Sequence, residues 1–201
     1  RAVRLAFDLV EIHAAHGYLL SQFLSPLANK RNDEYGGGAE NRMRFPLQVA
    51  EAMRAAWPAE RPMGARLNGT DWLEGGITTE EAVAFAGGLK EIGLDFVCVS
   101  SGGNSAKAKI PVAPGYQVHH AAEIKRATGL STIAVGLISN AELAEEIVAS
   151  GKADMVAVAR ALMDDPRWPW HAADALGADI DVAPQYVRAR PDLWPGAALK
   201  N

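Results

Sequence analysis

The chain has 201 residues, of which 49% are hydrophobic and 22% charged, the composition of a globular protein with a sizeable core. A net charge of −4 gives no electrostatic basis for binding nucleic acid or an anionic membrane, so neither partner is expected. The single cysteine, Cys98, excludes an internal disulfide, and no apolar run approaches the roughly 20 residues that span a bilayer. We therefore expect a cytoplasmic protein.

The N-terminal part of the chain predicts a helix end, a buried strand and a long loop. Residues 1–7 have the pattern of a last helical turn, and an apolar strand over 8–13 follows. Because side chains alternate along a strand, Glu11 and His13 are expected on one face of it. A polar, glycine-rich loop then continues through residue 38, and a loop of this length inside a compact domain is usually functional.

The rest of the chain alternates between helical and strand patterns. The expected elements are helices over 41–57, 78–92, 118–128 and 141–149 and strands over 63–67, 94–100, 132–135 and 154–158. Capping boxes at Thr78 and Ser139 mark two helix starts, and Asp165 followed by Pro166 indicates a third. Such alternation predicts βαβ units and a parallel sheet.

The fold class depends on where candidate functional residues lie. The pattern of elements alone leaves open a barrel or an open doubly wound sheet. One candidate follows each strand, and these are His13, Arg66, Ser101, Gly136 and Arg160. An open sheet would concentrate them at one switch point, so their spread favours an α/β barrel.

The residue pattern alone leaves several interpretations of these candidates. His13 and His16 could be metal ligands, but no carboxylate or cysteine lies at ligand spacing, so no metal site is expected and ordinary loop imidazoles remain an alternative. Tyr18, considered by itself, is more often a packing aromatic side chain than an acid. Arg66 on a buried strand needs an anion, which Glu11 of the neighbouring strand could supply.

Gly136 and Arg160 follow the last two strands, the place where barrels bind phosphate through backbone N–H groups. A turn glycine and a surface arginine are the alternative interpretation. Position alone does not decide between the two.

A long motif over residues 13–37, HAAHGYLLSQFLSPLANKRNDEYGG, resembles the signature of the Old Yellow Enzyme family of FMN-dependent ene-reductases, and most of all its thermophilic-like bacterial branch. Further matching motifs are NRMRFP (41–46), RLNGTDW (66–72), VSSGGN (99–104), PGYQV (114–118) and AVGLIS (134–139). The resemblance covers essentially the whole chain, and the family's first three strands are expected to be absent from it.

The resemblance implies a (β/α)8 TIM barrel of which only about the last five βα units are present. Residues 1–180 would form strands 4 to 8 of this flavin-binding barrel, and 181–201 an extended C-terminal arm. The implied activity is reduction of activated C=C bonds in α,β-unsaturated carbonyl or nitro compounds, with FMN as cofactor and NAD(P)H as reductant. The expected substrate is a small enone-type molecule.

The resemblance also assigns roles to individual residues. His13 and His16 would donate hydrogen bonds to the carbonyl or nitro oxygen of the substrate, an oxyanion-hole arrangement, and Tyr18 would supply the proton. The residues expected to hold FMN are Arg66, Ser101, Gly136, Ala159 and Arg160. The family usually has glycine before this arginine, and the methyl group of Ala159 would narrow the approach of a phosphate.

The arm would carry one more substrate-binding residue. In this branch a C-terminal arginine enters the active site of a neighbouring subunit, which makes Arg188 the candidate, with Arg190 as a second choice. A homo-oligomer, a dimer or larger, is therefore expected. A flexible arm with scattered charge is the alternative.

Two other functions remain open. The chain could be the front domain of a dienoyl-CoA-reductase-like or amine-dehydrogenase-like flavoprotein, although a single cysteine counts against an iron–sulfur cluster. It could also be a non-catalytic partial barrel. Five strands would leave two open edges, so we expect the isolated chain to bind FMN weakly and to associate through those edges.

Overall fold

The computed structural model describes residues 1–190 and 192–199 and contains one five-stranded parallel sheet. Its strands are β1 (Val10–Ala14), β2 (Met63–Asn68), β3 (Phe96–Ser100), β4 (Ser131–Ala134) and β5 (Met155–Val156). Each strand pairs with the next one in the chain, so the order is β1-β2-β3-β4-β5. A doubly wound sheet reverses its strand order at a switch point, whereas this sheet has the continuous order of a barrel wall.

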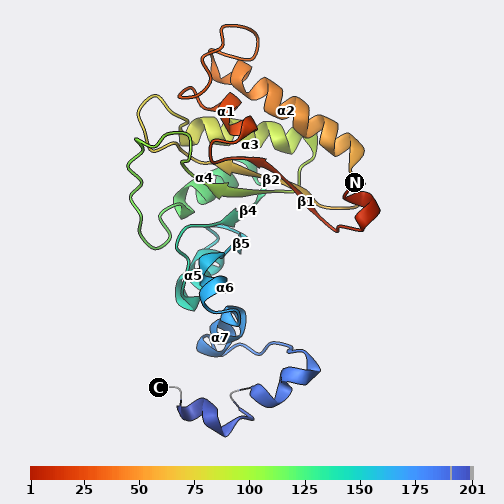
Figure 1. The fold of residues 1–201 in the computed structure, drawn as a ribbon, viewed down its shortest axis with the longest axis vertical. Coiled ribbons are helices and arrows are strands. Elements are labelled where there is room, and N and C mark those ends of the chain that lie inside the picture. The colour runs from red at the N-terminus through yellow and green to blue at the C-terminus, as the bar shows by residue number, and fades with distance from the viewer. Residues whose placement is uncertain (191, 200–201) are drawn as a thin grey trace.

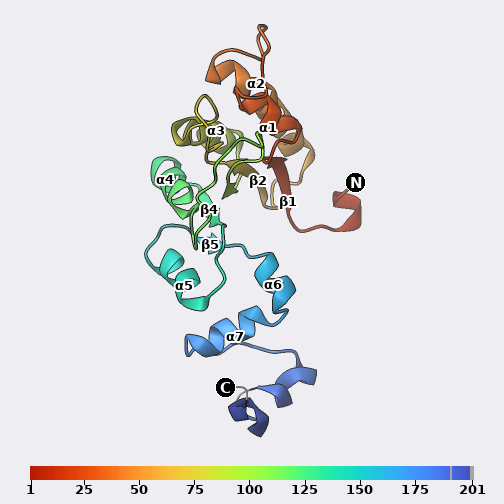
Figure 2. The same cartoon turned by 60° about the vertical axis from the view of Figure 1, so that its left-hand side comes forward.

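Helices follow the strands along the chain. They are α1 (Leu19–Leu24), α2 (Ala39–Ala56), α3 (Thr79–Ile92), α4 (Val118–Thr128), α5 (Ala141–Ala149), α6 (Arg160–Asp164) and α7 (Trp168–Ala175). Three 3₁₀ helices complete the description: η1 (Val3–Leu5), η2 (Pro184–Ala189) and η3 (Pro195–Leu199). In Figure 2 the helices α3, α4 and α5 lie one after another along the same side of the strands.

The two faces of the sheet have different chemistry. Side chains that point toward the helices are apolar and buried, and these include Ile12, Ala65, Leu67, Val97, Val99 and Ala134. The opposite face would line the interior of a closed barrel. There the register places His13 beside Arg66 and Arg66 beside Cys98, so charged and titratable groups share this face as the alternation of β1 predicts.

Phe96, the first residue of β3, lies at the amino-terminal end of this interior face. Its register partner on β2 is Gly64, and a Cβ atom added there would lie 2.3 Å from the Phe96 ring. Any side chain at Gly64 would therefore collide with the ring, which explains the glycine in the middle of a strand.

The sequence located most elements but misplaced some ends. Residues 1–7 contain the short η1 and not the expected end of an α-helix, and its apolar side chains are exposed. The fifth strand was expected over 154–158, but only Met155 and Val156 pair with β4. In the described sheet β5 pairs with β4 alone, so the length of the strand is set by that one pairing and not by the five-residue pattern.

The helix caps show the same mixture of outcomes. Thr78 caps α3 as predicted, because its side chain accepts a hydrogen bond from the Glu81 N–H. The cap of α5 was wrong by one residue: Asn140, not Ser139, accepts from the Leu143 N–H. The cap at Asp165 was misplaced, because Asp165 ends α6 and Arg167 is the N-cap of α7, although Asp165 Oδ1 accepts a hydrogen bond from the Arg167 N–H at 3.0 Å.

Beyond α7 the chain runs away from the sheet (Figure 1). This segment folds back locally on α7, since the ring of Tyr186 lies 5.4 Å from the ring of Trp170 and Arg167 stacks on both. Arg190 adds ion pairs with Asp179 and Asp192 at 3.0 Å each. All three partners are largely at the surface, so these pairs contribute little stability.

Candidate functional site

The segment that follows β1 brings the three predicted catalytic side chains together. The His13 ring lies 5.2 Å from the His16 ring and 5.1 Å from the Tyr18 ring, measured between centroids. His13 is on β1 itself, and the other two follow at the carboxyl end of the strand. Active sites of barrels are built at this end of the strands. The cluster can thus contact one small molecule with two imidazoles and a phenol.

His16 has a left-handed backbone, with a φ of 59°, and tight packing holds it there. Its N–H donates to Oδ1 of Asn68 at 3.4 Å. Gly17 and Gly103 bring the loops after β1 and β3 into backbone contact: a Cβ at Gly17 would lie 2.5 Å from the Gly103 carbonyl oxygen, and a Cβ at Gly103 would lie 2.5 Å from the His16 Cα. No side chain fits between these loops.

Burial and, to a smaller extent, the charge of Arg66 set the protonation of the cluster. Burial lowers the pKa of His16 to about 4, and the positive charges of Arg66 and His13 act in the same direction. Burial and Arg66 likewise lower the pKa of His13. Both imidazoles are therefore neutral at neutral pH, and each carries one N–H and one bare nitrogen. Burial raises the pKa of Glu11, against the opposing effect of Arg66.

Arg66 makes no ion pair in the described part of the chain, although Glu11 is near enough to feel its charge. Its Nε atom is buried without a hydrogen-bond partner, and the ion pair with Glu11 considered above is not found there. The residue as a whole is half-buried, and an anionic ligand on this face would give Nε a partner and pair with the charge. Arg66 thus fits a negatively charged cofactor or substrate.

A chain of hydrogen bonds links the histidine cluster to the ends of β3 and α4. Nε2 of His16 lies 2.7 Å from Oγ of Ser100, the last residue of β3. The Ser101 hydroxyl donates to Oε1 of Gln117 and accepts from the indole N–H of Trp72 at 2.6 Å. Ser101 was a predicted site residue, but Ser100 and Gln117 were missed although both lie in the quoted motifs.

Buried Asp71 joins three loops above the site and was also missed. Only 1% of its surface is exposed, and its carboxylate accepts from Ser25 Oγ at 2.6 Å, Asn104 Nδ2 at 2.7 Å and the Ile77 N–H at 2.9 Å. These partners come from the loops that follow β1, β2 and β3. Several donors thus compensate the buried charge and fix the loops relative to one another.

The residues predicted to bind the FMN phosphate follow β4 and β5, on the opposite side of the sheet from β1. Gly136 follows β4 with a φ of 115°, and a Cβ there would lie 2.8 Å from Nε2 of Gln117. Ala159 is the N-cap of α6, and Arg160 begins this helix with an exposed side chain. Since β4 and β5 are neighbours, these residues lie near one another. Arg188 is exposed on η2, in the segment that runs away from the sheet.

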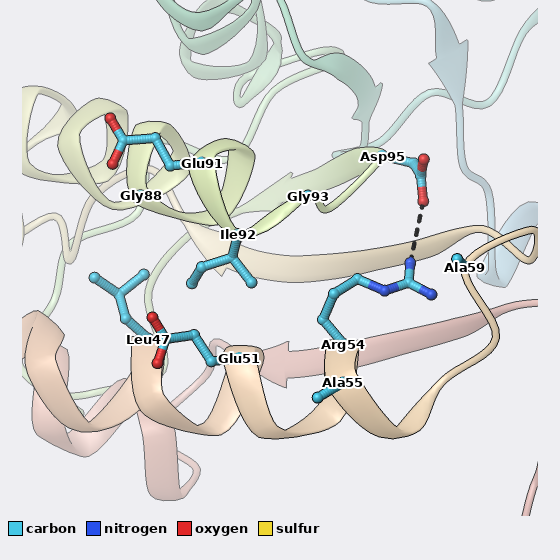
Figure 3. A pocket seen from close by; sticks show the side chains of 10 residues that line it. All are labelled: Leu47, Glu51, Arg54, Ala55, Ala59, Gly88, Glu91, Ile92, Gly93 and Asp95. Carbon is cyan, nitrogen blue, oxygen red and sulfur yellow. Dashed lines mark ion pairs between the residues drawn. The ribbon is translucent and has the colours of Figure 1, made fainter.

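A separate hollow lies outside the sheet, between α2 and α3 (Figure 3). It contains an ion pair of Arg54 with Asp95 at 3.8 Å. Asp95 precedes β3, so the hollow is at the amino ends of the strands, opposite the histidine cluster. None of the predicted site residues lines it.

The described residues contain no group of three or more His, Cys, Asp or Glu side chains arranged to hold a metal ion. None of their helices combines the length and the apolar character needed to cross a membrane.

Comparisons with known proteins agree with the fold. The family described as NADH:flavin oxidoreductase / NADH oxidase matches residues 1–178. The NADPH dehydrogenase of Geobacillus sp. (strain WCH70) is 46% identical over 188 residues, which are 94% of this chain and 54% of that protein. The NADPH dehydrogenase of Bacillus licheniformis is also 46% identical, with 94% and 55% covered. The chain spans about half the length of these curated relatives.

Solved structures share the arrangement of strands and helices. Morphinone reductase superposes with a TM-score of 0.68 at 31% identity, over 92% of this chain and 48% of that one. A 2-naphthoyl-CoA reductase superposes with a TM-score of 0.79 at 31% identity, over 88% and 27%. The five βα units are thus part of a (β/α)8 barrel, as predicted.

Proposed function

Because the chain belongs to the NADH:flavin oxidoreductase / NADH oxidase family, we propose that it carries the substrate-binding part of an FMN-dependent, NAD(P)H-driven reductase of activated C=C bonds. The observation that carries the proposal is the cluster of His13, His16 and Tyr18 on the same face as Arg66, whose Nε atom is buried without a hydrogen-bond partner. The names of the relatives, NADPH dehydrogenase and morphinone reductase, support a nicotinamide-driven reduction.

The residues on the interior face fit FMN. Arg66 supplies a cation that makes no ion pair in the described part of the chain, and its charge would favour an anionic flavin ring. Ser101 contributes a hydroxyl at the end of β3, and Gly136, Ala159 and Arg160 would hold the phosphate near β4 and β5. When bound, FMN would supply the redox chemistry, the transfer of hydride from NAD(P)H to the β-carbon of the substrate.

The chain's own residues bind and polarise the substrate. His13 and His16, both neutral, place N–H groups against the carbonyl or nitro oxygen, where negative charge develops as the C=C bond is reduced. Tyr18 is exposed beside His13, and its phenol transfers a proton to the α-carbon. A small enone-type molecule suits this set of donors.

A complementation experiment tests the function. This chain is co-expressed with the part of the Geobacillus NADPH dehydrogenase that it does not match, and the purified complex is saturated with FMN. Under anaerobic conditions, NADPH or NADH should bleach the flavin absorbance, and cyclohex-2-enone should restore it with formation of cyclohexanone. A complex that holds FMN and is bleached, but is not reoxidised by enones or nitroalkenes, would overturn the assignment of substrate class.

A second candidate function is the front domain of a larger flavoprotein. The superposition on 2-naphthoyl-CoA reductase, of which the chain covers 27%, favours it. The 46% identity to NADPH dehydrogenases, against 31% to that reductase, makes the stand-alone reductase our first proposal. Size determination of the natural protein separates the two.

Arg188 is proposed to bind substrate in a neighbouring subunit of a homo-oligomer. It is exposed on a segment directed away from its own sheet, so a second copy is the place where it could reach a site (Figure 1). In the complemented enzyme, Arg188→Ala should raise the KM for enone several-fold, and Arg190→Ala, which breaks only surface ion pairs, should not. An active enzyme that sediments as a single complex without further association would contradict this role.

A further inference from the structure

Ser100 has a choice of two hydrogen-bond acceptors and only one proton. Its Oγ lies 2.7 Å from Nε2 of His16 and 3.4 Å from Oε1 of Gln117. Hydroxyl donors form bonds of about 2.5–3.0 Å to oxygen, so the contact with Gln117 is too long for a strong bond. The side chain is buried, with 5% of its surface exposed, so solvent does not readily offer a third partner.

Trp72 fixes the direction of the neighbouring bonds. An indole N–H can only donate, so Ser101 Oγ accepts from Trp72 at 2.6 Å and directs its own proton elsewhere. That proton goes to Oε1 of Gln117, which uses one of the two lone pairs of this atom. Because Gln117 Oε1 already has this close donor and lies 3.4 Å from Ser100 Oγ, the Ser100 proton goes to the nearer acceptor, Nε2 of His16 at 2.7 Å.

We propose that Ser100 is a positioning residue: its hydroxyl donates to Nε2 of His16 and holds this imidazole in the tautomer that carries its proton on Nδ1. A neutral imidazole has one N–H, so an accepting Nε2 leaves Nδ1 as the donor. In the described part of the chain Nδ1 of His16 has no hydrogen-bond partner, and the ring is only half-buried. The donor is thus free for a ligand.

The consequence for chemistry rests on the proposed function. A carbonyl or nitro oxygen can only accept hydrogen bonds, so His16 can stabilise it only through a protonated nitrogen that is not already engaged. With the other tautomer, Nε2–H would donate to Ser100 and the bare Nδ1 would repel the substrate oxygen. The choice of tautomer therefore decides whether His16 assists or opposes binding.

The tautomer can be measured without catalysis. In the complemented, FMN-loaded protein, with only this chain carrying ¹⁵N-histidine, long-range ¹H–¹⁵N correlation spectra at pH 7 distinguish protonated from bare ring nitrogens. Loss of one signal set in His16→Asn assigns His16 among the five histidines of the chain. We expect a protonated Nδ1 and a bare Nε2. A protonated Nε2 in the wild-type spectrum overturns the proposal.

Two variants of Ser100 connect the tautomer to function. Ser100→Ala should move the His16 proton toward Nε2 and lower kcat/KM for enone on the order of tenfold, the effect of one hydrogen bond. Ser100→Thr keeps the hydroxyl and should restore both the Nδ1–H signal and the rate. A wild-type tautomer in Ser100→Ala would overturn the role of Ser100. A confirmed Nδ1–H form in a protein that reduces no enone would instead count against the proposed function alone.

Discussion

His16 combines backbone strain with a solvent-accessible imidazole. A non-glycine residue in a left-handed conformation costs on the order of 1–3 kcal/mol, and such residues persist where the surroundings fix them. Here Asn68, Ser100 and the backbone of Gly103 supply that support. In this backbone conformation the His16 ring lies beside the His13 ring.

Tyr18→Phe separates the two half-reactions at the residue scale. Flavin reduction by NADPH needs no proton at a substrate carbon, so its rate should change little. Reoxidation by an enone needs that proton, and its rate should fall by roughly 10²-fold or more. Stopped-flow absorbance of each half-reaction measures both rates. An unchanged rate of reoxidation would exclude Tyr18 as the proton donor.

His120 makes stability depend on pH. It is 97% buried, its Nδ1 lies 2.8 Å from Thr79 Oγ1, its Nε2 has no partner in the described part of the chain, and burial lowers its pKa from 6.5 to about 4. Between pH 6.5 and 4 the unfolded chain binds a proton that the folded chain does not. The free energy of unfolding should therefore fall as the pH drops through this window, and be insensitive to His120 above it.

The variant His120→Gln should make this fall in stability shallower, because it removes the titrating group. His119→Gln, at an exposed neighbour, is the control and should keep most of the wild-type dependence. Urea denaturation at pH 5 and pH 7 measures the effect. Equal pH dependence in the wild type and His120→Gln would contradict the assignment.

Much of the residue-level site could not be predicted from the sequence. The cluster of His13, His16 and Tyr18 is local in the chain, so its motif was sufficient to place it. The supports of His16 come from Asn68 and Ser100, which are 52 and 84 residues away. Their contacts depend on how three loops pack, and no local pattern encodes that.

At the scale of elements, local signals located helices better than strand ends. The Thr78 capping box placed the start of α3 because the bond from the Glu81 N–H lies within one turn. The length of β5 depends on pairing with β4, a property of two segments together. Ser139 and Asn140 are both good capping residues, and only the backbone shows which one caps α5.

Paired substitutions test the cap of α5. Asn140→Ala removes the acceptor of the Leu143 N–H at 2.8 Å and should lower the free energy of unfolding by about 1 kcal/mol. Ser139→Ala leaves that bond intact and should change stability by much less. Thermal or urea denaturation compares the two. A larger loss of unfolding free energy in Ser139→Ala than in Asn140→Ala would show that Ser139 caps α5, as the sequence suggested.

At the scale of the whole molecule, β1 and β5 each lack a second neighbour in the described sheet. Apolar side chains lie at both edges: Leu9, just before β1, and Met155 of β5 are each 44% exposed. Unpaired parallel edges favour association with other strands. The 201-residue chain alone should therefore bind FMN weakly and form oligomers at micromolar concentration.

Charged residues at the edges should reduce this association. Sedimentation velocity of Leu9→Lys/Met155→Lys should show a shift toward monomer, because lysine at an edge disfavours pairing. Val148→Lys changes a comparably exposed apolar residue on α5 and serves as the control. A wild-type chain that is monomeric and holds stoichiometric FMN would show that five strands are self-sufficient.

The strand order β1-β2-β3-β4-β5 also bears on synthesis of the protein. Each strand hydrogen-bonds to the one that left the ribosome just before it, and the intervening helix is complete by the time the new strand emerges. Within this sheet, no strand is inserted between two that have already paired. The sheet can therefore grow during translation one unit at a time, with its growing edge always formed by the newest strand.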